Sequence, residues 1–390
     1  MMLFPKRPFS KFKTASFLGK KLKKDFSFRS GKIIGSMCSV PPVYAGRLFR
    51  KYIGKNLGDP GLCPGTAEIE QEAIQMLGSL LGNSRAAGVF TTGGTEANFL
   101  ALLTAKKRSE ACRREIILSD CAHFSFFKAA EMMDLRPILI PHNEDYSINI
   151  EAAAAKISDR TMALIGIAGT TGTGSIDDIP ALAALARKHN LYFHVDAAFG
   201  GFVLPFLEKA GYPTKPFDFS VEGVCSVTID PHKMGRGITP GGCILYRDRE
   251  LADSAAFDVS YLAGGKTRHY TLVGTRSGAA VLANWAQMVR LGEKGYTETV
   301  RKCMRLALFL ARELEEIEGI RCIKHPEINV VAFRSTRIPP EQLNEKLRAD
   351  GWAVSLFGDY FRIVVMPHVT VRTIRRFLKD LKRMTGETHA

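Results

Sequence analysis

Four short segments of the chain carry residue types from which a catalytic site could be built. The first reads TTGGTEAN, at residues 91–98. Glycines let the backbone approach a ligand closely, and the free N–H groups at a helix start, with the hydroxyl of Thr95, form an anion site that suits a phosphate. The alternative is that Gly93 and Gly94 form only a turn between a strand and a helix. The spacing matches neither the Walker phosphate loop nor the dinucleotide-binding GxGxxG pattern.

The second segment reads HVDAAFGG, at residues 194–201, and places an acid at the end of an apolar strand. The carboxylate of Asp196 can hold a positively charged ring nitrogen or a metal ion. The small residues Ala197 and Ala198 leave room for a flat ring against the backbone. Taken alone, this aspartate is more often a residue that caps the following turn.

The third segment reads TIDPHKMG, at residues 228–235, and the fourth reads SDCAHFS, at residues 119–125. Lys233 follows a buried strand and stands beside His232, so we expect a lowered pKa, and a neutral amine forms a Schiff base with an aldehyde. The alternative is an ordinary surface lysine. His123 starts a helix after a strand, a position that more often serves packing or capping than catalysis.

All four segments lie at the ends of predicted strands of one sheet. Ligands of open α/β sheets bind outside the carboxyl ends of the strands. A glycine-rich anion site, a histidine, an aspartate and a lysine, gathered there together, describe a site for pyridoxal phosphate.

The elements that must position these residues alternate along residues 86–246. Short β-branched runs separated by amphipathic stretches predict a doubly wound, mainly parallel seven-stranded sheet, an α/β fold. The predicted strands are 88–92, 115–119, 136–140, 162–168, 192–195, 224–229 and 242–246. The predicted helices between them are 95–106, 124–134 and 179–189.

The pattern changes after residue 275 and predicts a small α+β C-terminal unit. Its predicted helices are 276–291, 296–318, 341–350 and 371–384, and its strands are 329–334, 353–356 and 361–366. We therefore divide the chain into a basic arm (1–30), a helical segment (31–85), a large cofactor-binding domain (86–275) and the C-terminal domain (276–390).

Composition excludes several classes of protein. The 390 residues are 46% hydrophobic and 24% charged, which suits a globular core and excludes a disordered chain. No apolar run is long enough for a membrane-spanning helix, so we expect no membrane partner. The eight cysteines form no CxxC pair, which argues against a disulfide framework and against a zinc site, and favours a reducing cytoplasm.

Positive charge is concentrated at the start of the chain. The formal net charge is +15, and residues 1–32 hold ten basic side chains and one acid, Asp25, which gives this segment +9. A basic start can be an organelle transit peptide, a contact for nucleic acid or an anionic surface, or a solvated arm. We favour the solvated arm, because charge runs are usually solvated faces.

Several motifs make the chain resemble a known family. GTTGT (169–173), VDAAFGG (195–201), DPHKM (230–234) and YFRIV (360–364) resemble the group II amino-acid decarboxylases, which have the type I pyridoxal phosphate fold of aspartate aminotransferase. GSMC (35–38) and NLGDPGL (56–62) are most similar to the archaeal L-tyrosine/L-aspartate decarboxylases. The resemblance runs from about residue 31 to the C-terminal helix.

The resemblance implies a role for each matching residue. Lys233 would form the Schiff base, Asp196 would pair with the pyridine nitrogen, and His123 would stack on the ring. The other cofactor contacts would come from Gly94, Thr95 and His232 near the phosphate, Thr170 or Thr171 near the ring substituents, Ala198 beside the ring, and Thr275 across the interface of a homodimer. Arg362 would bind the substrate's α-carboxylate. The segment 258–270 would be a mobile lid, with Tyr261 or Tyr270 as proton donor.

The implied reaction is decarboxylation of a free L-amino acid. The product would be tyramine from L-tyrosine, for methanofuran, or β-alanine from L-aspartate, for coenzyme A, or both. One alternative is a type I pyridoxal phosphate enzyme that acts on aminoacyl-tRNA, like the phosphoseryl-tRNA to cysteinyl-tRNA synthase; Arg362 argues against it and makes a nucleic-acid partner unlikely. Another is a non-catalytic protein that binds RNA or an anionic surface, against which the intact Lys233, Asp196 and His123 argue.

Overall fold

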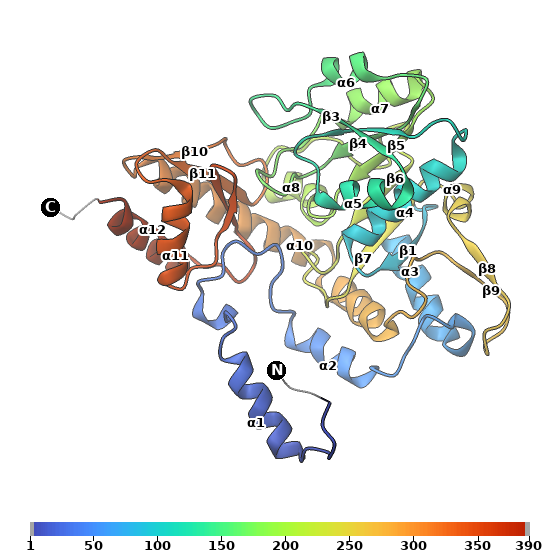
Figure 1. Cartoon of the computed structure of the whole chain (residues 1–390), viewed down its shortest axis with the longest axis horizontal. Coiled ribbons are helices and arrows are strands. Elements are labelled where there is room, and N and C mark those ends of the chain that lie inside the picture. Colours follow the sequence, from blue (N-terminus) through green and yellow to red (C-terminus); the bar gives the residue numbers. More distant parts are fainter. Residues whose placement is uncertain (1–3, 387–390) are drawn as a thin grey trace.

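A seven-stranded sheet forms the centre of the larger part of the molecule. The computed structural model describes residues 4–386 (Figure 1). The strand order is β1-β7-β6-β5-β4-β2-β3, and β7 runs in the direction opposite to the other six strands. The strands are β1 (Ala87–Thr91), β2 (Glu115–Ser119), β3 (Arg136–Ile140), β4 (Thr161–Ile167), β5 (Tyr192–Asp196), β6 (Ser226–Ile229) and β7 (Gly242–Tyr246). The predicted mainly parallel sheet of seven strands is confirmed.

Helices cover both faces of this sheet, which makes the fold doubly wound. One apolar cluster packs α4 (Gly94–Arg108), α5 (Phe124–Met133) and α9 (Arg249–Ser254) on the sheet. A second cluster packs the other face with α3 (Pro64–Leu80), α6 (Ile150–Lys156), α7 (Ile179–Lys188) and α8 (Leu204–Ala210). Burial of apolar side chains on both faces explains why the central strands read as continuous hydrophobic runs.

One long helix, α10 (Gly278–Glu315), joins the two parts of the molecule (Figure 1). The sequence predicted two helices here, at 276–291 and 296–318. The interruption falls at Gly292, whose φ of 53° and ψ of −173° are not helical. A positive φ is readily adopted by glycine because it has no Cβ, so Gly292 allows the kink without ending the element.

The C-terminal part is a four-stranded antiparallel sheet covered by helices, an α+β unit as predicted, but its strand β10 was not among the three predicted strands. The strand order is β10-β11-β13-β12. The strands are β10 (Ile320–Cys322), β11 (Val330–Ser335), β12 (Ser355–Phe357) and β13 (Tyr360–Val364), and the helices are α11 (Pro340–Ala349) and α12 (Val371–Thr385). A chain segment near the N-terminus completes this unit, because Val364 N donates to Ile34 O at 2.8 Å and Gly35 N donates to Ala353 O at 2.8 Å.

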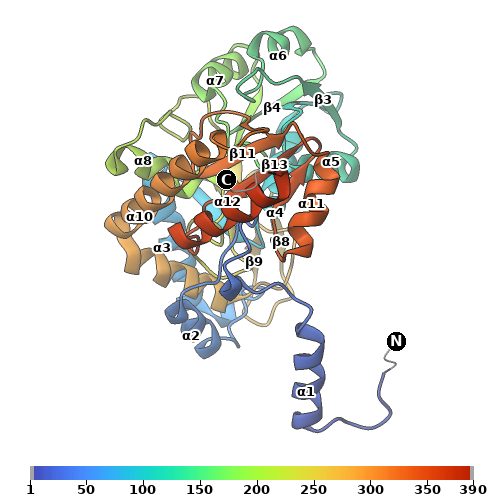
Figure 2. The same cartoon turned by 90° about the vertical axis from the view of Figure 1, so that its left-hand side faces the viewer.

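Two peripheral elements extend from this body. Helix α1 (Lys11–Leu22) has no buried residue and projects away from the rest of the chain in both views (Figures 1 and 2). Strands β8 (Phe257–Val259) and β9 (Thr267–His269) form a hairpin within the segment predicted as a lid. The remaining elements are α2 (Val43–Lys51) and the short 3-10 helices Phe28–Ser30, Pro60–Leu62 and Gly200–Phe202. In residues 4–386 no helix is long and apolar enough to span a membrane.

Candidate active site

A pocket opens at the carboxyl ends of the central strands, beside the N-terminus of α4. Its volume is about 280 Å³. The sequence-predicted residues that line it are Gly94, Thr95, His123, Thr171, Asp196, Ala198, His232 and Lys233. They come from distant parts of the chain. They meet because each one either follows a strand of the same sheet or is the last residue of such a strand.

Lys233 lies beside a second carboxylate to which the sequence interpretation gave no role. Its Nζ is 2.9 Å from Asp230 Oδ2, and Asp230 has a side-chain exposure of 1%. The lowered pKa expected for Lys233 is wrong in this structure: burial favours the neutral amine, but the charges of Asp230 and Asp196 outweigh it and raise the pKa. The i, i+3 spacing in DPHK was the signal that could have indicated this pair.

Asp196 ends β5 and is held in place through both of its oxygens. Ala198 N donates to Oδ1 at 3.0 Å, and Asn98 Nδ2 donates to Oδ2 at 2.9 Å. The amide oxygen of Asn98 accepts from Thr228 Oγ1 at 2.8 Å and faces His194 Nε2 at 3.2 Å. Burial lowers the pKa of His194 to about 4, so this imidazole is neutral at ordinary pH. Asp196 therefore caps a turn and also presents a fixed carboxylate to the pocket.

Asn98 was part of a quoted motif, yet the sequence interpretation assigned it no function. It lies on α4, three residues after Thr95. At this spacing Asn98 and Thr95 lie on the same side of the helix, next to the glycine-rich turn at its start. Its amide also donates to Ser125 Oγ at 3.0 Å. Helical spacing could have indicated that Asn98 supports the site.

His123 caps α5 and lines the pocket. Its Nδ1 accepts from Ser125 N at 3.3 Å and lies 2.9 Å from Ser125 Oγ. Burial, together with the nearby Lys233 charge, lowers its pKa against the influence of Asp196. The neutral imidazole presents a flat, uncharged face, as stacking on an aromatic ring requires.

The start of α4 has the form of an anion-binding turn. A Cβ at Gly94 would lie 2.9 Å from Asp230 Oδ2 and 3.1 Å from Ala198 Cβ, so a side chain at position 94 would fill this part of the pocket. His232 lies beside the turn, with Nδ1 2.5 Å from Gly241 O, and its Cε1 is the nearest atom to a Cβ built on Gly93. Burial lowers the pKa of His232, but Cys38 and Asp230 raise it more, so that the net shift is upward. A higher pKa favours the charged imidazolium, which attracts an anion.

The structure separates the two threonines between which the sequence could not choose. Thr171 lines the pocket. Thr170 is buried in a chain of hydroxyls, with 2.9 Å from Thr170 Oγ1 to Thr173 Oγ1 and 2.9 Å from Thr173 Oγ1 to Ser175 Oγ. Lys324 Nζ donates to Ser175 Oγ at 2.8 Å, which ties this loop to the C-terminal part. Thr170 therefore supports the loop, and Thr171 faces the site.

Arg362 lies on β13 beside Thr171, which lines the pocket, whereas Arg362 itself is not among the lining residues. Its Nη1 donates to Thr171 O at 2.9 Å, and its Nη2 donates to Ser355 Oγ at 2.7 Å and to Gly35 O. The buried Nε has no hydrogen-bond partner, and within the described chain no carboxylate pairs with this guanidinium. Burial lowers the pKa of Arg362 to about 10. A buried cation of this kind favours an incoming anion.

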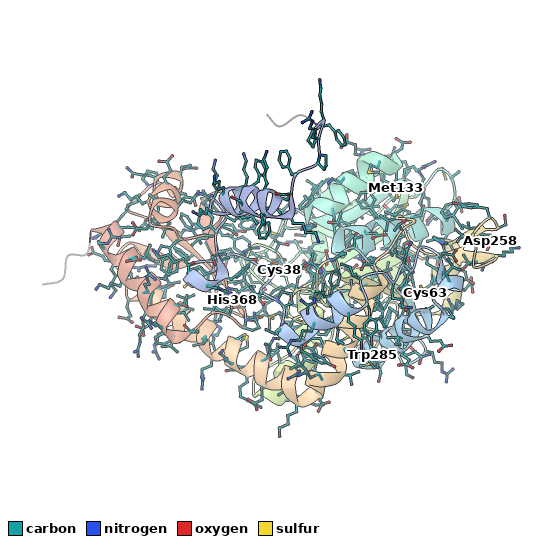
Figure 3. The ribbon with its side chains drawn as sticks, turned by 90° about the horizontal axis from the view of Figure 1, so that it is seen from below. Cys38, Cys63, Met133, Asp258, Trp285 and His368 are labelled. Atoms are coloured by element: carbon teal, nitrogen blue, oxygen red, sulfur yellow. The ribbon has the colours of Figure 1, made fainter. Side chains whose placement is uncertain are left out.

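Besides Thr170 and Arg362, three predicted site residues do not line the pocket of their own chain. The Tyr270 hydroxyl donates to Asp253 Oδ1 at 2.9 Å, beside α9, and Tyr261 is 86% exposed in the β8–β9 hairpin. In Figure 3, Asp258 of this hairpin stands at one edge of the molecule and Cys38 stands near its centre. Thr275 packs beside Gly58. The roles predicted for these three residues therefore require another subunit or a movement of the segment.

Two cysteines near the pocket were missed by the sequence interpretation. Cys121 lines the pocket, and burial, followed by the charge of Asp120, raises its pKa to about 12. Cys38 lies close enough to His232 to raise its pKa. Both lie inside quoted motifs, SDCAHFS and GSMC, and their nearness to His123 and His232 depends on tertiary contacts that spacing alone does not give.

These residues fit pyridoxal phosphate. The pocket offers one carboxylate for a ring nitrogen, one lysine amine for an aldehyde, a neutral imidazole for the ring face and a helix N-terminus for a phosphate. The space above Gly94, which a Cβ would occupy, keeps the turn open to a ligand. The donor set matches the cofactor that the sequence resemblance implies.

Comparisons with known proteins agree with this donor set. The model of the pyridoxal-dependent decarboxylase conserved domain matches residues 35–336. The chain is 47% identical to an L-aspartate decarboxylase of Thermococcus kodakarensis, over 98% of this chain and 99% of the relative. It is 40% identical to a probable L-tyrosine/L-aspartate decarboxylase of Methanothermobacter thermautotrophicus, over 91% of this chain and 98% of the relative.

A solved structure shows the same architecture. The glutamate decarboxylase of Lactobacillus brevis superposes with a TM-score of 0.90 at 25% sequence identity, over 100% of this chain and 96% of the other. The fold is the type I pyridoxal phosphate fold that the sequence predicted.

Proposed function

The chain belongs to the family of pyridoxal-dependent decarboxylases, and from this premise we propose that it removes the α-carboxylate of L-aspartate to give β-alanine. The observation that carries this proposal is the buried, uncompensated guanidinium of Arg362 beside Thr171. A guanidinium binds a carboxylate through two parallel hydrogen bonds, and this fixes the plane of the carboxylate as well as its place.

The charged residues of the pocket have separate roles in this reaction. Bound pyridoxal phosphate supplies an aldehyde for the substrate amine and a ring that takes up the electron pair left when CO2 departs. Asp196, fixed by Ala198 N and Asn98 Nδ2, holds a proton on the ring nitrogen, because a nearby carboxylate favours the charged form. Lys233 offers its Nζ to the aldehyde, and Asp230 Oδ2, at 2.9 Å, accepts the proton that the ammonium must lose.

Orientation decides which bond of the substrate breaks. Arg362 holds the α-carboxylate on one side, and His123 holds the ring face on the other. With the cofactor bound, these two residues would together favour loss of the carboxylate, because the bond that breaks must lie where its electrons can pass to the ring. Without Arg362 the substrate would bind, but its α-carboxylate would lack a fixed direction.

Two observations favour aspartate over tyrosine. The T. kodakarensis relative, named for aspartate alone, shares 47% identity, against 40% for the relative named for both amino acids. The pocket, at about 280 Å³, must hold the cofactor and the substrate side chain together, and this favours a short side chain.

We further propose that the working form is a homodimer in the cytoplasm. Thr275, Tyr261 and the exposed Phe257 and Leu272 lie outside their own pocket, and an adjoining subunit would give them a partner and complete its site. All eight cysteines are free thiols, which suits a reducing compartment.

The aminoacyl-tRNA alternative fits the geometry less well. The carboxylate of an aminoacyl-tRNA is esterified, so it carries no charge for Arg362. In an ester complex the buried guanidinium would remain unpaired, at a cost in binding energy.

The test is a comparison of substrates with purified protein loaded with pyridoxal phosphate. L-aspartate, L-tyrosine and L-glutamate are supplied separately, and CO2 and the amine are measured. We expect β-alanine from aspartate, with the highest kcat/KM of the three. A higher kcat/KM for tyrosine, with tyramine as product, would overturn the choice of substrate and leave the decarboxylase intact. Release of no CO2 from any of them would overturn the function.

A further inference from the structure

Three side chains with metal-binding groups converge at the edge of the pocket. Asp120, Cys121 and His142 each offer one ligand atom, and these atoms all lie within 4.8 Å of one another. His142 Nδ1 is already 3.0 Å from Asp120 Oδ1 and 3.1 Å from Asp120 Oδ2. A shared zinc ion holds its ligand atoms within about 4 Å of one another, so only small rotations of the exposed side chains are needed.

The sheet itself brings the three residues together. Strands β2 and β3 are parallel neighbours, and Ser119 pairs with Ile140 at the end of the ladder. Asp120 N donates to Ile140 O at 3.0 Å, so the chain after β2 and the chain after β3 leave the sheet side by side. The placement of the donor groups is therefore built on rigid strands, as a metal site requires.

The imidazole is also oriented before any ligand arrives. The ring of His142 stacks on Tyr146, with centroids 4.5 Å apart and an interplanar angle of 15°. This contact keeps Nδ1 turned toward Asp120. A partner that fixes the direction of a ligating histidine is a regular feature of metal sites.

The donor set selects a class of metal. One thiolate, one imidazole and one carboxylate suit a borderline-soft divalent cation such as Zn²⁺, whereas Mg²⁺ and Ca²⁺ prefer oxygen ligands. Three protein ligands leave the fourth tetrahedral position open to water or to a carboxylate. The absence of CxxC pairs led us to expect no zinc site from the sequence, but CxxC spacing does not describe a mixed set with one cysteine, whose members meet only in the fold.

We propose that Asp120, Cys121 and His142 bind a Zn²⁺-type cation at the mouth of the cofactor pocket, and that the bound cation inhibits decarboxylation. Asp120 and His142 are exposed, whereas Cys121 lines the pocket, so the site spans from solvent to the place where the substrate enters. On binding, the Cys121 thiol forms an S–Zn bond and releases its proton to the medium. The open position then captures the substrate's carboxylate away from Lys233. This inhibitory effect rests on the proposed function; the binding itself does not.

The binding test uses the purified protein and Co²⁺ as a coloured substitute for Zn²⁺. We expect one equivalent of Co²⁺ with a thiolate-to-cobalt absorption band, displaced by Zn²⁺. Cys121→Ser should lose the band, and His142→Ala should weaken binding by at least about tenfold. Cys112→Ser is the matched control, because Cys112 has a carboxylate neighbour, Glu110 Oε2 at 3.7 Å, and lies at the opposite end of β2. Absence of the band in the wild type, or its survival in Cys121→Ser, would overturn the site.

The inhibition test compares activity with and without Zn²⁺ within each variant. We expect Zn²⁺ to reduce wild-type turnover, a chelator to restore it, and His142→Ala to need at least about tenfold more Zn²⁺ for the same loss. Equal sensitivity of His142→Ala and wild type would overturn the inhibitory role and point to the Cys38–His232 pair instead. If the wild type binds Co²⁺ but decarboxylates nothing, the proposed function fails while the metal site stands.

Discussion

Lys233 Nζ lies 2.9 Å from Asp230 Oδ2, and the two residues form an ion pair at the floor of the pocket. Lys233 follows Asp230 by three positions along the chain, at the turn that follows β6. Burial favours the neutral amine of Lys233, but Asp230 and Asp196 together raise its pKa. Asp230 therefore sets both the position and the protonation of the amine that must react.

Replacement of Asp230 should change how readily this amine reacts. In Asp230→Asn, the pKa of Lys233 falls because the nearest negative charge is gone, so the amine is neutral over a wider pH range. We expect the pH midpoint for uptake of pyridoxal phosphate by the apoprotein to drop by about 1 unit. Uptake is followed by the visible absorbance of the bound cofactor. Asp120→Asn serves as control, and the same midpoint in wild type and Asp230→Asn would show that the pair does not control the amine.

Loss of the amine itself should stop the reaction. In Lys233→Ala, turnover should fall by about a thousandfold or more, because no other lysine lines the pocket. Because the variant leaves the buried Asp230 carboxylate without its ion-pair partner, circular dichroism is recorded beside activity to show that the variant is folded. Full activity in this variant, measured as CO2 release, would contradict the assignment.

Asn98 is expected to act through Asp196 as a positioning residue. Asn98→Ala removes the hydrogen bond to Asp196 Oδ2, and a hydrogen bond to a charged group is worth enough to lower kcat by about tenfold to a hundredfold. The absorption spectrum of the bound cofactor should also change, because the ring nitrogen holds its proton less firmly. Thr104→Val is the control, because it removes another buried hydrogen bond of α4, to Tyr246, away from Asp196. An unchanged spectrum in Asn98→Ala would indicate a purely structural role.

Arg362 should need its geometry as well as its charge. In Arg362→Lys, kcat/KM for aspartate should fall by about tenfold or more, because an ammonium cannot fix the plane of the carboxylate. The loss should be larger in Arg362→Ala. Activity should also decline above about pH 10, where the Arg362 guanidinium loses its charge. Arg334→Lys, on the neighbouring strand β11, is the control; an equal kcat/KM for Arg362→Lys and wild type would show that the substrate binds elsewhere.

Acid should weaken the connection between the two parts of the molecule. Burial alone would raise the pKa of Glu327, but Lys215 and Lys324 lower it below 4.5. The ion pairs of Glu327 with Lys215 and Lys324 therefore stabilise the folded state above about pH 4.5. This contribution is lost as the pH falls through the lowered pKa of Glu327. Glu327→Gln should cost about 1 kcal/mol of unfolding free energy at neutral pH and almost nothing in acid. Urea unfolding at several pH values measures this; Glu293→Gln, in an exposed pair, should cost little at any pH.

The sequence predicted those features that follow from strand order and motif type. The seven strands, three of the four C-terminal strands and the gathering of Asp196, His123 and Lys233 needed only hydrophobic patterning and the rule for strand ends. The choice between Thr170 and Thr171 needed the path of a turn, which no periodicity describes. The β8–β9 hairpin was predicted only as a lid because its strands are short and exposed.

Contacts between distant segments account for the other differences. The raised pKa of Lys233 depends on how close Asp230 comes, and sequence gives the residue but not the distance. Cys121 and His142 meet because β2 and β3 are neighbours, although the whole of α5 separates them along the chain. The hydrogen bond from Asn98 to Asp196 joins α4 to β5, and this pairing forms only when the helix packs on the sheet.

The fate of each carboxylate of L-aspartate tests the central claim most directly. Aspartate labelled isotopically in its α-carboxylate, and separately in its β-carboxylate, is given to the loaded enzyme, and the label is followed into CO2 and into the amine. Because Arg362 fixes the α-carboxylate, we expect the α label to appear in CO2 and the β label to remain in β-alanine. Release of the β label, with alanine as product, or release of neither label, would contradict the assignment of Arg362 and the reaction built on it.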